Sequence, residues 1–251
     1  MIVAVSGKGG TGKTVIAALL VRCFTGMGRE VLAIDADPDS NLAEALGVEV
    51  ERTLGEIREE MLAKMESLPP GVSWRTTLEY ETHRAIVEAE DFDLLSMGRP
   101  EGQGCYCAVN HVLRQIIDTL AENYEVVVID TEAGLEHLSR RTTQSVDVML
   151  VVTDTSKRGI TTALRIKELA EELSIGFRKL AVVINRATPE TEGRLQEYAE
   201  ELGLEVAGVV PEDAQVRELD LRGEPLLKLS EDSPAARAVC GIARKVMELG
   251  A

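Results

Sequence analysis

A glycine-rich stretch directly after the first apolar run constrains the fold of this chain most. Residues 7–14 read GKGGTGKT and stand between the apolar run at residues 2–5 and a helical pattern that opens with VIAALLVRCF. Glycines allow consecutive backbone N–H groups to curve around phosphate oxygens, and this loop needs a strand before it and a helix after it. The sequence therefore predicts a nucleotide-binding P-loop at its amino end.

Each position of the loop has an expected role. Lys13 is expected to neutralise the β- and γ-phosphate charges, and the Thr14 hydroxyl to ligate Mg²⁺. The backbone that cradles the phosphates comes from Gly9, Gly10, Thr11 and Gly12. We expect ATP or ADP with Mg²⁺ as the ligand. The alternative, a glycine turn with an exposed lysine, does not require the flanking strand and helix.

Short apolar runs recur along the chain and predict a parallel sheet. They are nearly continuous in Val, Ile and Leu, which is typical of strands covered on both faces. They lie at residues 2–5, 31–34, 94–95, 126–129, 148–152, 180–184 and 206–210. Helical patterns lie between them, so we expect one α/β domain over residues 1–251, a doubly wound, mostly parallel β-sheet flanked by helices. The charged stretch 49–91 is expected to form a helical insertion.

The composition of the chain limits the kinds of partner that it can bind. The chain has 43 acidic against 27 basic residues, a net charge of −16 that opposes non-specific binding to DNA or to anionic membranes. No window approaches the roughly 20 apolar residues that span a bilayer, and the first apolar run leads into glycines and lysines rather than into a signal-peptide core. We therefore expect a cytoplasmic protein in a reducing compartment, with neither nucleic acid nor membrane as partner.

The second residue of the loop, Lys8, is not needed to bind phosphate within one subunit. GKGGTGKT resembles the deviant Walker A sequence of the MinD, ParA and nitrogenase iron protein group, whose second lysine reaches across a dimer to the partner's nucleotide. A cation supplied in trans stabilises the charge that develops on the transferred phosphoryl group. The resemblance implies a homodimer that hydrolyses ATP, with Lys8 and Lys13 among its catalytic residues. The alternative leaves Lys8 as a solvated loop residue.

The same resemblance assigns roles to residues that follow later strands. In DADPDSN, residues 35–41, Asp37 matches the carboxylate that positions the attacking water, and Asp39 is a second candidate. Asp130 matches the Walker B aspartate that holds Mg²⁺, at the strand ends where α/β ligand sites gather. Adenine contacts are matched by Asn185 and Arg186, and the loop over the base by Pro211, Glu212 and Asp213. Simple turns are the alternative for these last two assignments.

The four cysteines fall into two kinds. Cys23 and Cys240 lie in apolar helical patterns and are expected to be buried small hydrophobic residues. Cys105 and Cys107 lie just before a helix predicted to begin near Ala108, and a helix N-terminus favours the thiolate and hence metal binding. Two thiolates cannot fill a tetrahedral Zn²⁺ site, but a twofold axis near the pair would supply two more. A redox-active or incidental thiol pair is the alternative.

Several motifs together are similar to the CooC family of accessory ATPases, which support nickel insertion into carbon monoxide dehydrogenase. The likeness covers nearly the whole chain and rests on GQGCYCAVN (residues 102–110), DADPDSN, DTEAGLEHL and the phosphate loop. It implies a cytosolic homodimer with Zn²⁺ or Ni²⁺ at Cys105 and Cys107, and the dehydrogenase apoenzyme as partner. Thiolate ligands do not decide between the two metals.

Two other functions fit parts of this pattern. A partitioning or positioning ATPase of the ParA or MinD kind, which assembles reversibly on a partner surface, predicts a basic surface or a terminal amphipathic membrane helix. The final stretch SPAARAVCGIARKVMELGA is short of basic and bulky apolar residues and reads as a domain-packing helix. An electron-donating iron protein would place its two cluster cysteines in separate loops, whereas here they share one.

Overall fold

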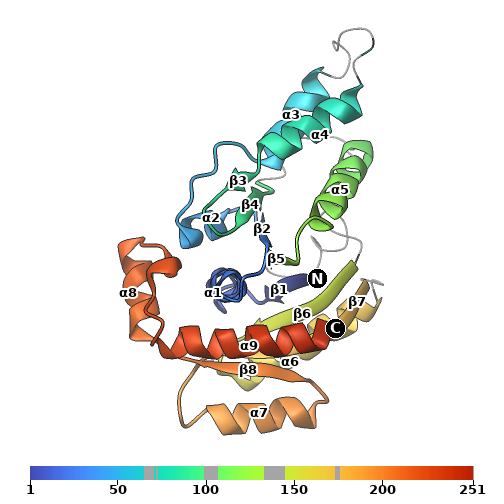
Figure 1. Cartoon of the computed structure of the whole chain (residues 1–251). Helices are drawn as coiled ribbons and strands as arrows, with labels where there is room; N and C mark the ends of the chain where they lie inside the picture. Colours follow the sequence, from blue (N-terminus) through green and yellow to red (C-terminus); the bar gives the residue numbers. More distant parts are fainter. Residues whose placement is uncertain (65–70, 72, 99–106, 133–144, 173–175, 251) are drawn as a thin grey trace.

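Eight strands form one sheet in the computed structural model, which describes residues 1–64, 71, 73–98, 107–132, 145–172 and 176–250 (Figure 1). Their order across the sheet is β3-β4-β2-β5-β1-β6-β7-β8, and all neighbours are parallel except β3 and β4. The strands are β1 (Ile2–Gly7), β2 (Val31–Ala36), β3 (Val87–Glu88), β4 (Asp93–Ser96), β5 (Val126–Thr131), β6 (Ser145–Thr153), β7 (Gly176–Ala187) and β8 (Val206–Pro211). The doubly wound, mostly parallel α/β fold predicted from the apolar runs is confirmed.

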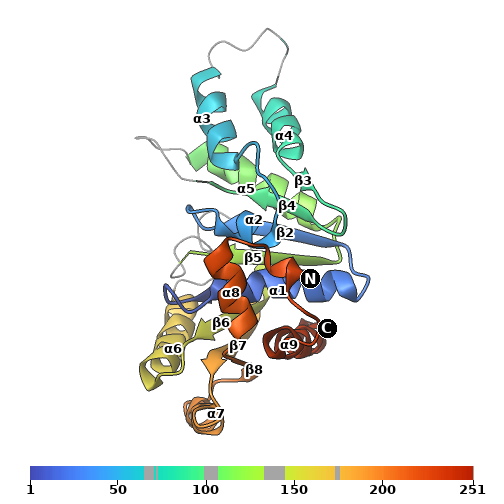
Figure 2. The same ribbon diagram turned by 90° about the vertical axis from the view of Figure 1, so that its left-hand side faces the viewer.

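Helices cover both faces of the sheet (Figure 2). On one face lie α1 (Lys13–Gly26), α2 (Asn41–Leu46), α8 (Ala214–Arg222), the 3₁₀ helix η3 (Leu226–Lys228) and α9 (Pro234–Gly250). On the other lie α3 (Leu54–Lys64), α4 (Trp74–Arg84), α5 (Cys107–Ala121), α6 (Lys157–Glu172) and α7 (Glu192–Glu201). Successive strand residues point to opposite faces: in β1, Val3 and Val5 join the first core and Ala4 joins the second. Two hydrophobic cores thus hold the sheet from both sides.

The charged insertion at residues 49–91 contains the two helices that its composition favours and one strand that it does not reveal. α3 and α4 project together from one end of the molecule (Figures 1 and 2). The two-residue strand β3 pairs antiparallel with β4, with Val87 opposite Leu94. A run this short carries no periodicity, so only its pairing with β4 defines it as a strand.

A disulfide joins the two helices in which buried free cysteines were expected. Cys23 of α1 is bonded to Cys240 of α9, with Cα atoms 5.2 Å apart and 217 residues between them in the sequence. Cys23 is buried as expected, whereas Cys240 is partly exposed, and the two are bonded rather than separate hydrophobic residues. The pairing depends on α1 packing against α9 on one face of the sheet, and separate helical patterns carry no sign of that packing.

The carboxyl ends of the parallel strands gather the polar residues of the fold. Asp35 in β2 lies beside Asp130 in β5, and Asn185 lies near the end of β7. The phosphate loop begins at the end of β1, next to β5. None of the helices in the described part of the chain has the length and apolarity that crossing a membrane requires.

Candidate functional site

The loop between β1 and α1 has the backbone geometry that wraps a phosphate group. Gly10 and Gly12 have φ angles of +79° and +90°, a region that favours glycine, and a Cβ on Gly12 would collide with the side-chain amide of Asn185. The Thr11 hydroxyl donates to the Lys8 carbonyl at 2.8 Å, which closes the loop on itself. The N-terminus of α1, at Lys13, therefore faces the space that the loop encloses, with its free N–H groups available to an anion.

The two loop lysines occupy opposite environments. Lys13 is 8% exposed, whereas Lys8 is exposed at the rim together with Gly9 and Gly10. A buried ammonium group within the loop is suited to neutralising phosphate charge in the same chain. An exposed one on a flexible stem is free to meet a group outside the chain.

Asp130 has the properties expected of a carboxylate that binds a cation. It is 1% exposed, and neither carboxylate oxygen has a hydrogen-bond partner among the residues that the structure describes. Burial raises the pKa of Asp130 to about 7; the nearby Thr14 hydroxyl and the Lys13 charge oppose this rise, while Asp35 and Asp37 add to it. Thr14 lies close enough to affect the pKa, but no hydrogen bond of normal geometry joins it to the carboxylate. A buried carboxylate without partners beside a hydroxyl fits Mg²⁺, which prefers oxygen ligands.

Asp35 is a further buried carboxylate at this edge, and the sequence reasoning missed it. Burial raises its pKa to about 6, opposed by hydrogen bonds from the backbone N–H groups of Leu42 and Asp37 at 2.9 and 3.2 Å. These bonds fold residues 35–42 back onto the end of β2. The sequence did carry a sign of this burial, because Asp35 stands between the apolar residues Ile34 and Ala36 at the end of a strand.

The two aspartates that sequence reasoning did select lie in this folded-back turn. Asp37 is half-buried, and its Oδ1 accepts the backbone N–H of Asp39 at 3.0 Å. Asp39 is exposed. The geometry thus separates three carboxylates of one motif: Asp35 anchors the turn, Asp37 lies between it and solvent, and Asp39 faces outward.

Residues expected to contact adenine line one cavity of about 340 Å³ next to the phosphate loop. Its walls include Asn185, Arg186, Pro211, Glu212 and Asp213, together with Val15 of α1 and Ala235 of α9. Five residues from two segments of the sequence are thus brought to one place. The cavity adjoins the loop through the side chains of the first two residues.

Asn185 and Arg186 fix the phosphate loop as well as lining the cavity. The Asn185 side-chain amide, 5% exposed, donates to the Thr11 carbonyl at 2.9 Å. Arg186 has a φ angle of +58°, and its guanidinium donates to the Gly10 carbonyl at 3.2 Å. A polar residue in this left-handed conformation is uncommon and is held here by the loop that it supports.

Asp213 shapes the cavity rather than offering a free carboxylate to it. It caps α8 by accepting the Gln215 N–H at 2.8 Å, and its other oxygen accepts the Ser233 hydroxyl at 2.6 Å and the Ala235 N–H at 3.2 Å. Burial acts to raise the pKa of Asp213, but these hydrogen bonds outweigh it and hold the pKa below its usual value. The carboxylate therefore ties the start of α8 to the start of α9.

The cysteine pair predicted to bind metal falls at a boundary of the described residues. Cys105 lies outside them, and for Cys107 only the backbone is described, as the first residue of α5. Among the described residues, no three His, Cys, Asp or Glu side chains gather as a metal-binding group. The helix start expected near Ala108 is confirmed within one residue.

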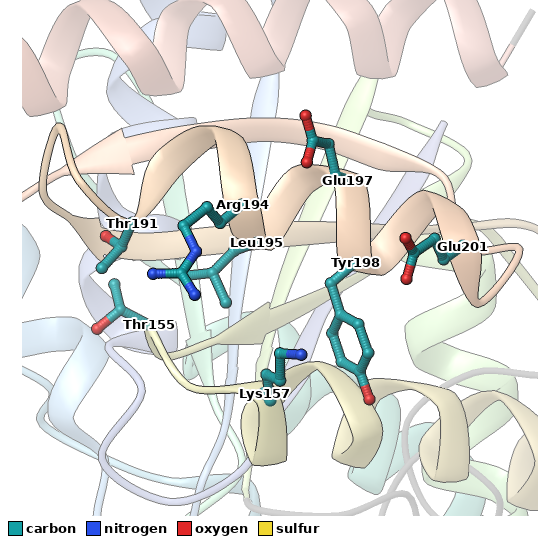
Figure 3. Close-up of a pocket in the computed structure, with 8 residues that line it drawn as sticks. All are labelled: Thr155, Lys157, Thr191, Arg194, Leu195, Glu197, Tyr198 and Glu201. Atoms are coloured by element: carbon teal, nitrogen blue, oxygen red, sulfur yellow. The ribbon is translucent and has the colours of Figure 1, made fainter.

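A second cavity, of about 360 Å³, lies between α6 and α7 and was not suggested by the sequence (Figure 3). Lys157, at the start of α6, places its ammonium group 4.6 Å from the centre of the Tyr198 ring of α7. Arg194 lines the same cavity, as do Glu197 and Glu201 (Figure 3). Charges of both signs line it, so it does not select a ligand by charge.

Comparisons with known proteins agree with this geometry. Residues 2–226 match the CobQ/CobB/MinD/ParA nucleotide binding domain. An uncharacterised ATP-binding protein of Methanocaldococcus jannaschii is 53% identical over 249 residues, 98% of each chain. The carbon monoxide dehydrogenase accessory protein CooC of Rhodospirillum rubrum is 32% identical over 249 residues, 94% of this chain and 92% of the relative. The MinD cell division protein of Aquifex aeolicus superposes with a TM-score of 0.70 at 25% identity, covering 98% of this chain and 96% of that one.

The matched region spans the phosphate loop, both buried aspartates and the residues that line the neighbouring cavity, except Ala235. The chain therefore belongs to the CobQ/CobB/MinD/ParA family of nucleotide-binding domains, which contains ATPases of the MinD and ParA kind.

Proposed function

We propose that this protein hydrolyses ATP as a nucleotide-dependent homodimer that holds Zn²⁺ or Ni²⁺ between the chains and delivers nickel to carbon monoxide dehydrogenase. The observation that carries the proposal is the contrast between the two lysines of one loop. Lys13 is buried against its own phosphate site, while Lys8 is exposed where a second chain can present its nucleotide. A loop that served only its own chain would not need the outer lysine.

Each residue of the site has a part in the proposed hydrolysis. The loop backbone and Lys13 hold the β- and γ-phosphates, and Asp130 with Thr14 holds Mg²⁺. When bound, Mg²⁺ supplies positive charge against the transferred phosphoryl group. Asp37, half-buried and positioned by its hydrogen bond from Asp39, orients the attacking water. The partner's Lys8 then stabilises the charge on the phosphoryl oxygens, as a cation supplied in trans does in other phosphoryl-transfer enzymes.

The proposed base site follows from the cavity beside the loop. Its volume of about 340 Å³ and its mixed lining of Val15, Pro211 and the polar Asn185 and Arg186 suit a flat aromatic base with exocyclic polar groups. Hydrogen bonds join two of these residues directly to the phosphate loop. Occupation of the cavity is therefore expected to fix the loop that holds the phosphates.

The metal site is proposed to belong to the dimer. Cys107 begins α5, so the positive end of that helix lies at this residue and favours a thiolate there. Two thiolates from each chain would complete a Cys₄ site. Because ATP and metal would then favour the same dimer, each would strengthen binding of the other. The CooC relative from Rhodospirillum rubrum supports the dehydrogenase as client.

A partitioning or positioning ATPase is the second candidate, and the likeness to the Aquifex aeolicus MinD protein favours it. Such a protein would work by assembling reversibly on a partner surface. The two candidates separate by metal content, since only the first requires the cysteine pair.

Replacing Cys105 and Cys107 together by Ser tests the proposal. We expect the variant to bind ATP as the wild-type protein does but to lose the Zn²⁺ that the wild type holds at one ion per two chains, measured by elemental analysis after gel filtration. His83→Gln, which removes an exposed potential ligand on α4, is the matched control and should retain the metal. Retention of one ion per two chains by the double cysteine variant would refute the shared site.

A further inference from the structure

We propose that the Cys23–Cys240 disulfide is a thiol-exchange site that takes small anionic thiols, and that an arginine-lined cavity guides them to it. The bond forms part of the wall of a cavity of about 470 Å³ between α1 and α9. This cavity is separate from the proposed nucleotide site, and the proposal does not depend on the ATPase function.

Positive charge dominates the walls of this cavity although the whole chain is acidic. Arg22 enters from α1, and Arg237 and Arg244 enter from α9, against a single carboxylate, Glu231. The local charge is therefore +2 in a chain whose net charge is −16. At physiological salt, interactions between exposed charges more than about 8 Å apart are largely screened, so these local groups decide which thiols approach.

The arginines are only partly neutralised by their neighbours. The Arg22 guanidinium donates to the Leu229 carbonyl at 2.6 Å, which fixes its position but leaves its charge. Arg237 lies 4.0 Å from the carboxylate of Asp232, and both side chains are mostly solvated, so this pair is weak. Arg244 is exposed and has no ion-pair partner in the part of the chain that the structure describes. Guanidinium groups at these positions suit carboxylate or sulfonate groups.

The two sulfurs differ in access, which sets the direction of exchange. Cys240 is partly exposed and lines the cavity, whereas Cys23 is 5% exposed. The incoming thiolate attacks the Cys240 sulfur, the bond to Cys23 breaks, and Cys23 leaves as a thiolate. A second thiol then attacks the mixed disulfide on its added sulfur. This releases the small-molecule disulfide and the Cys240 thiol, so that two thiols are oxidised and one protein disulfide is reduced.

The nearby guanidinium groups also favour the leaving group. Positive charge stabilises a thiolate relative to its thiol, and a better leaving thiolate speeds exchange. A disulfide that served only as a permanent link would gain nothing from a cavity with three guanidinium groups in its walls. The arrangement suits a disulfide that is reversibly reduced and reformed.

Three thiols of similar size and different charge test the proposal: 2-mercaptoethanesulfonate, 2-mercaptoethanol and cysteamine. The native full-length protein is treated with each, and alkylation with peptide mass mapping follows Cys23 and Cys240 separately from Cys105 and Cys107. Per thiolate, we expect the anionic reagent to open the bond roughly tenfold faster than the cationic one. The Arg237→Gln, Arg244→Gln double variant should lose this preference, while Arg165→Gln, an exposed arginine of α6, should keep it.

Several results would overturn the proposal. The net charge of the chain by itself predicts the reverse order, with cysteamine fastest. A preference that persisted in the arginine variant would remove the cavity as its cause. Free Cys23 and Cys240 thiols in protein isolated in air without reductant, or a bond that no thiol opens below unfolding conditions, would also contradict it.

Discussion

At the scale of single residues, two buried carboxylates dominate the site. Asp35 and Asp130 are paired in register on neighbouring strands and are nearly inaccessible to solvent. Burying two like charges side by side destabilises a fold unless cations or hydrogen bonds compensate. Asp35 receives backbone hydrogen bonds, but Asp130 receives none by geometric criteria within the described residues. The fold thus keeps a carboxylate whose compensation comes from Lys13 and, in the proposed complex, from Mg²⁺.

This arrangement predicts a pH dependence of stability without nucleotide and Mg²⁺. The pKa of folded Asp130 is raised from its ordinary value of 3.8 to about 7, so the folded protein holds this proton more tightly than the unfolded chain does. The corresponding stability is present at low pH and is lost as the pH rises from about 4 to about 7. Asp130→Asn should therefore be more stable than the wild type at pH 8, by on the order of a few kcal/mol, and similar to it near pH 4.

Denaturant unfolding of both proteins in chelator at the two pH values measures this difference. Asp39→Asn is the matched control, because this aspartate of the same motif is exposed and should leave the pH profile unchanged. Equal free energies of unfolding for wild type and Asp130→Asn at pH 8 would show that the charge is not buried as described.

Individual residues show which parts of the site can be predicted from the sequence. The spacing of the loop pattern assigned phosphate and Mg²⁺ roles to Lys13 and Thr14, and these roles stay predictions. The family resemblance assigned Asp130 to Mg²⁺. It passed over Asp35, since the difference between Asp35 and Asp37 arises from a turn that folds back onto the backbone of Leu42. It also placed Asp213 in the loop over the base, which stays a prediction, but it did not reveal that this carboxylate is engaged with Ser233 and the starts of two helices. Contacts between distant segments are invisible in local patterns.

At the scale of elements, the seven predicted strands are present because continuous apolar runs are a strong local signal. What could not be predicted is pairing across the fold. The edge strand β3 exists through its bonds to β4, and the Cys23–Cys240 bond exists because α1 and α9 pack side by side. The bond links α1, which begins at the phosphate loop, to α9, whose Ala235 lines the cavity beside that loop.

Removing this link should lower stability measurably. A crosslink between residues 217 positions apart restricts the unfolded chain strongly, and such bonds typically contribute about 2 to 4 kcal/mol. The Cys23→Ser, Cys240→Ser variant should unfold at lower denaturant concentration than the oxidised wild type. Adding reductant should bring the wild type down toward the variant and leave the variant unchanged. Identical unfolding curves for variant and oxidised wild type would show that the bond does not constrain the chain.

At the scale of the whole molecule, part of the phosphate loop is exposed to solvent and can meet a second chain. Lys8, Gly9 and Gly10 of the phosphate loop are exposed, and Cys107 is the first residue of α5. In the proposed account each chain binds nucleotide by itself, whereas Lys8 and the two thiolates meet their partners only in a second copy. The central claim is that ATP brings two chains together, so that Lys8 of each chain meets the nucleotide of the other and the cysteines of both chains meet at one metal ion.

Sedimentation velocity with simultaneous metal analysis tests this claim most directly. With Mg²⁺, ATP and Zn²⁺, the wild type is predicted to sediment as a dimer with one zinc per two chains, and without ATP the dimer fraction should fall. Lys8→Ala should bind ATP yet remain largely monomeric. Lys179 is an exposed lysine near the start of β7, at the other end of that strand from Asn185, and Lys179→Ala should behave as the wild type. A wild-type monomer carrying one zinc per chain in ATP, or a Lys8→Ala variant that dimerises fully, would contradict the account.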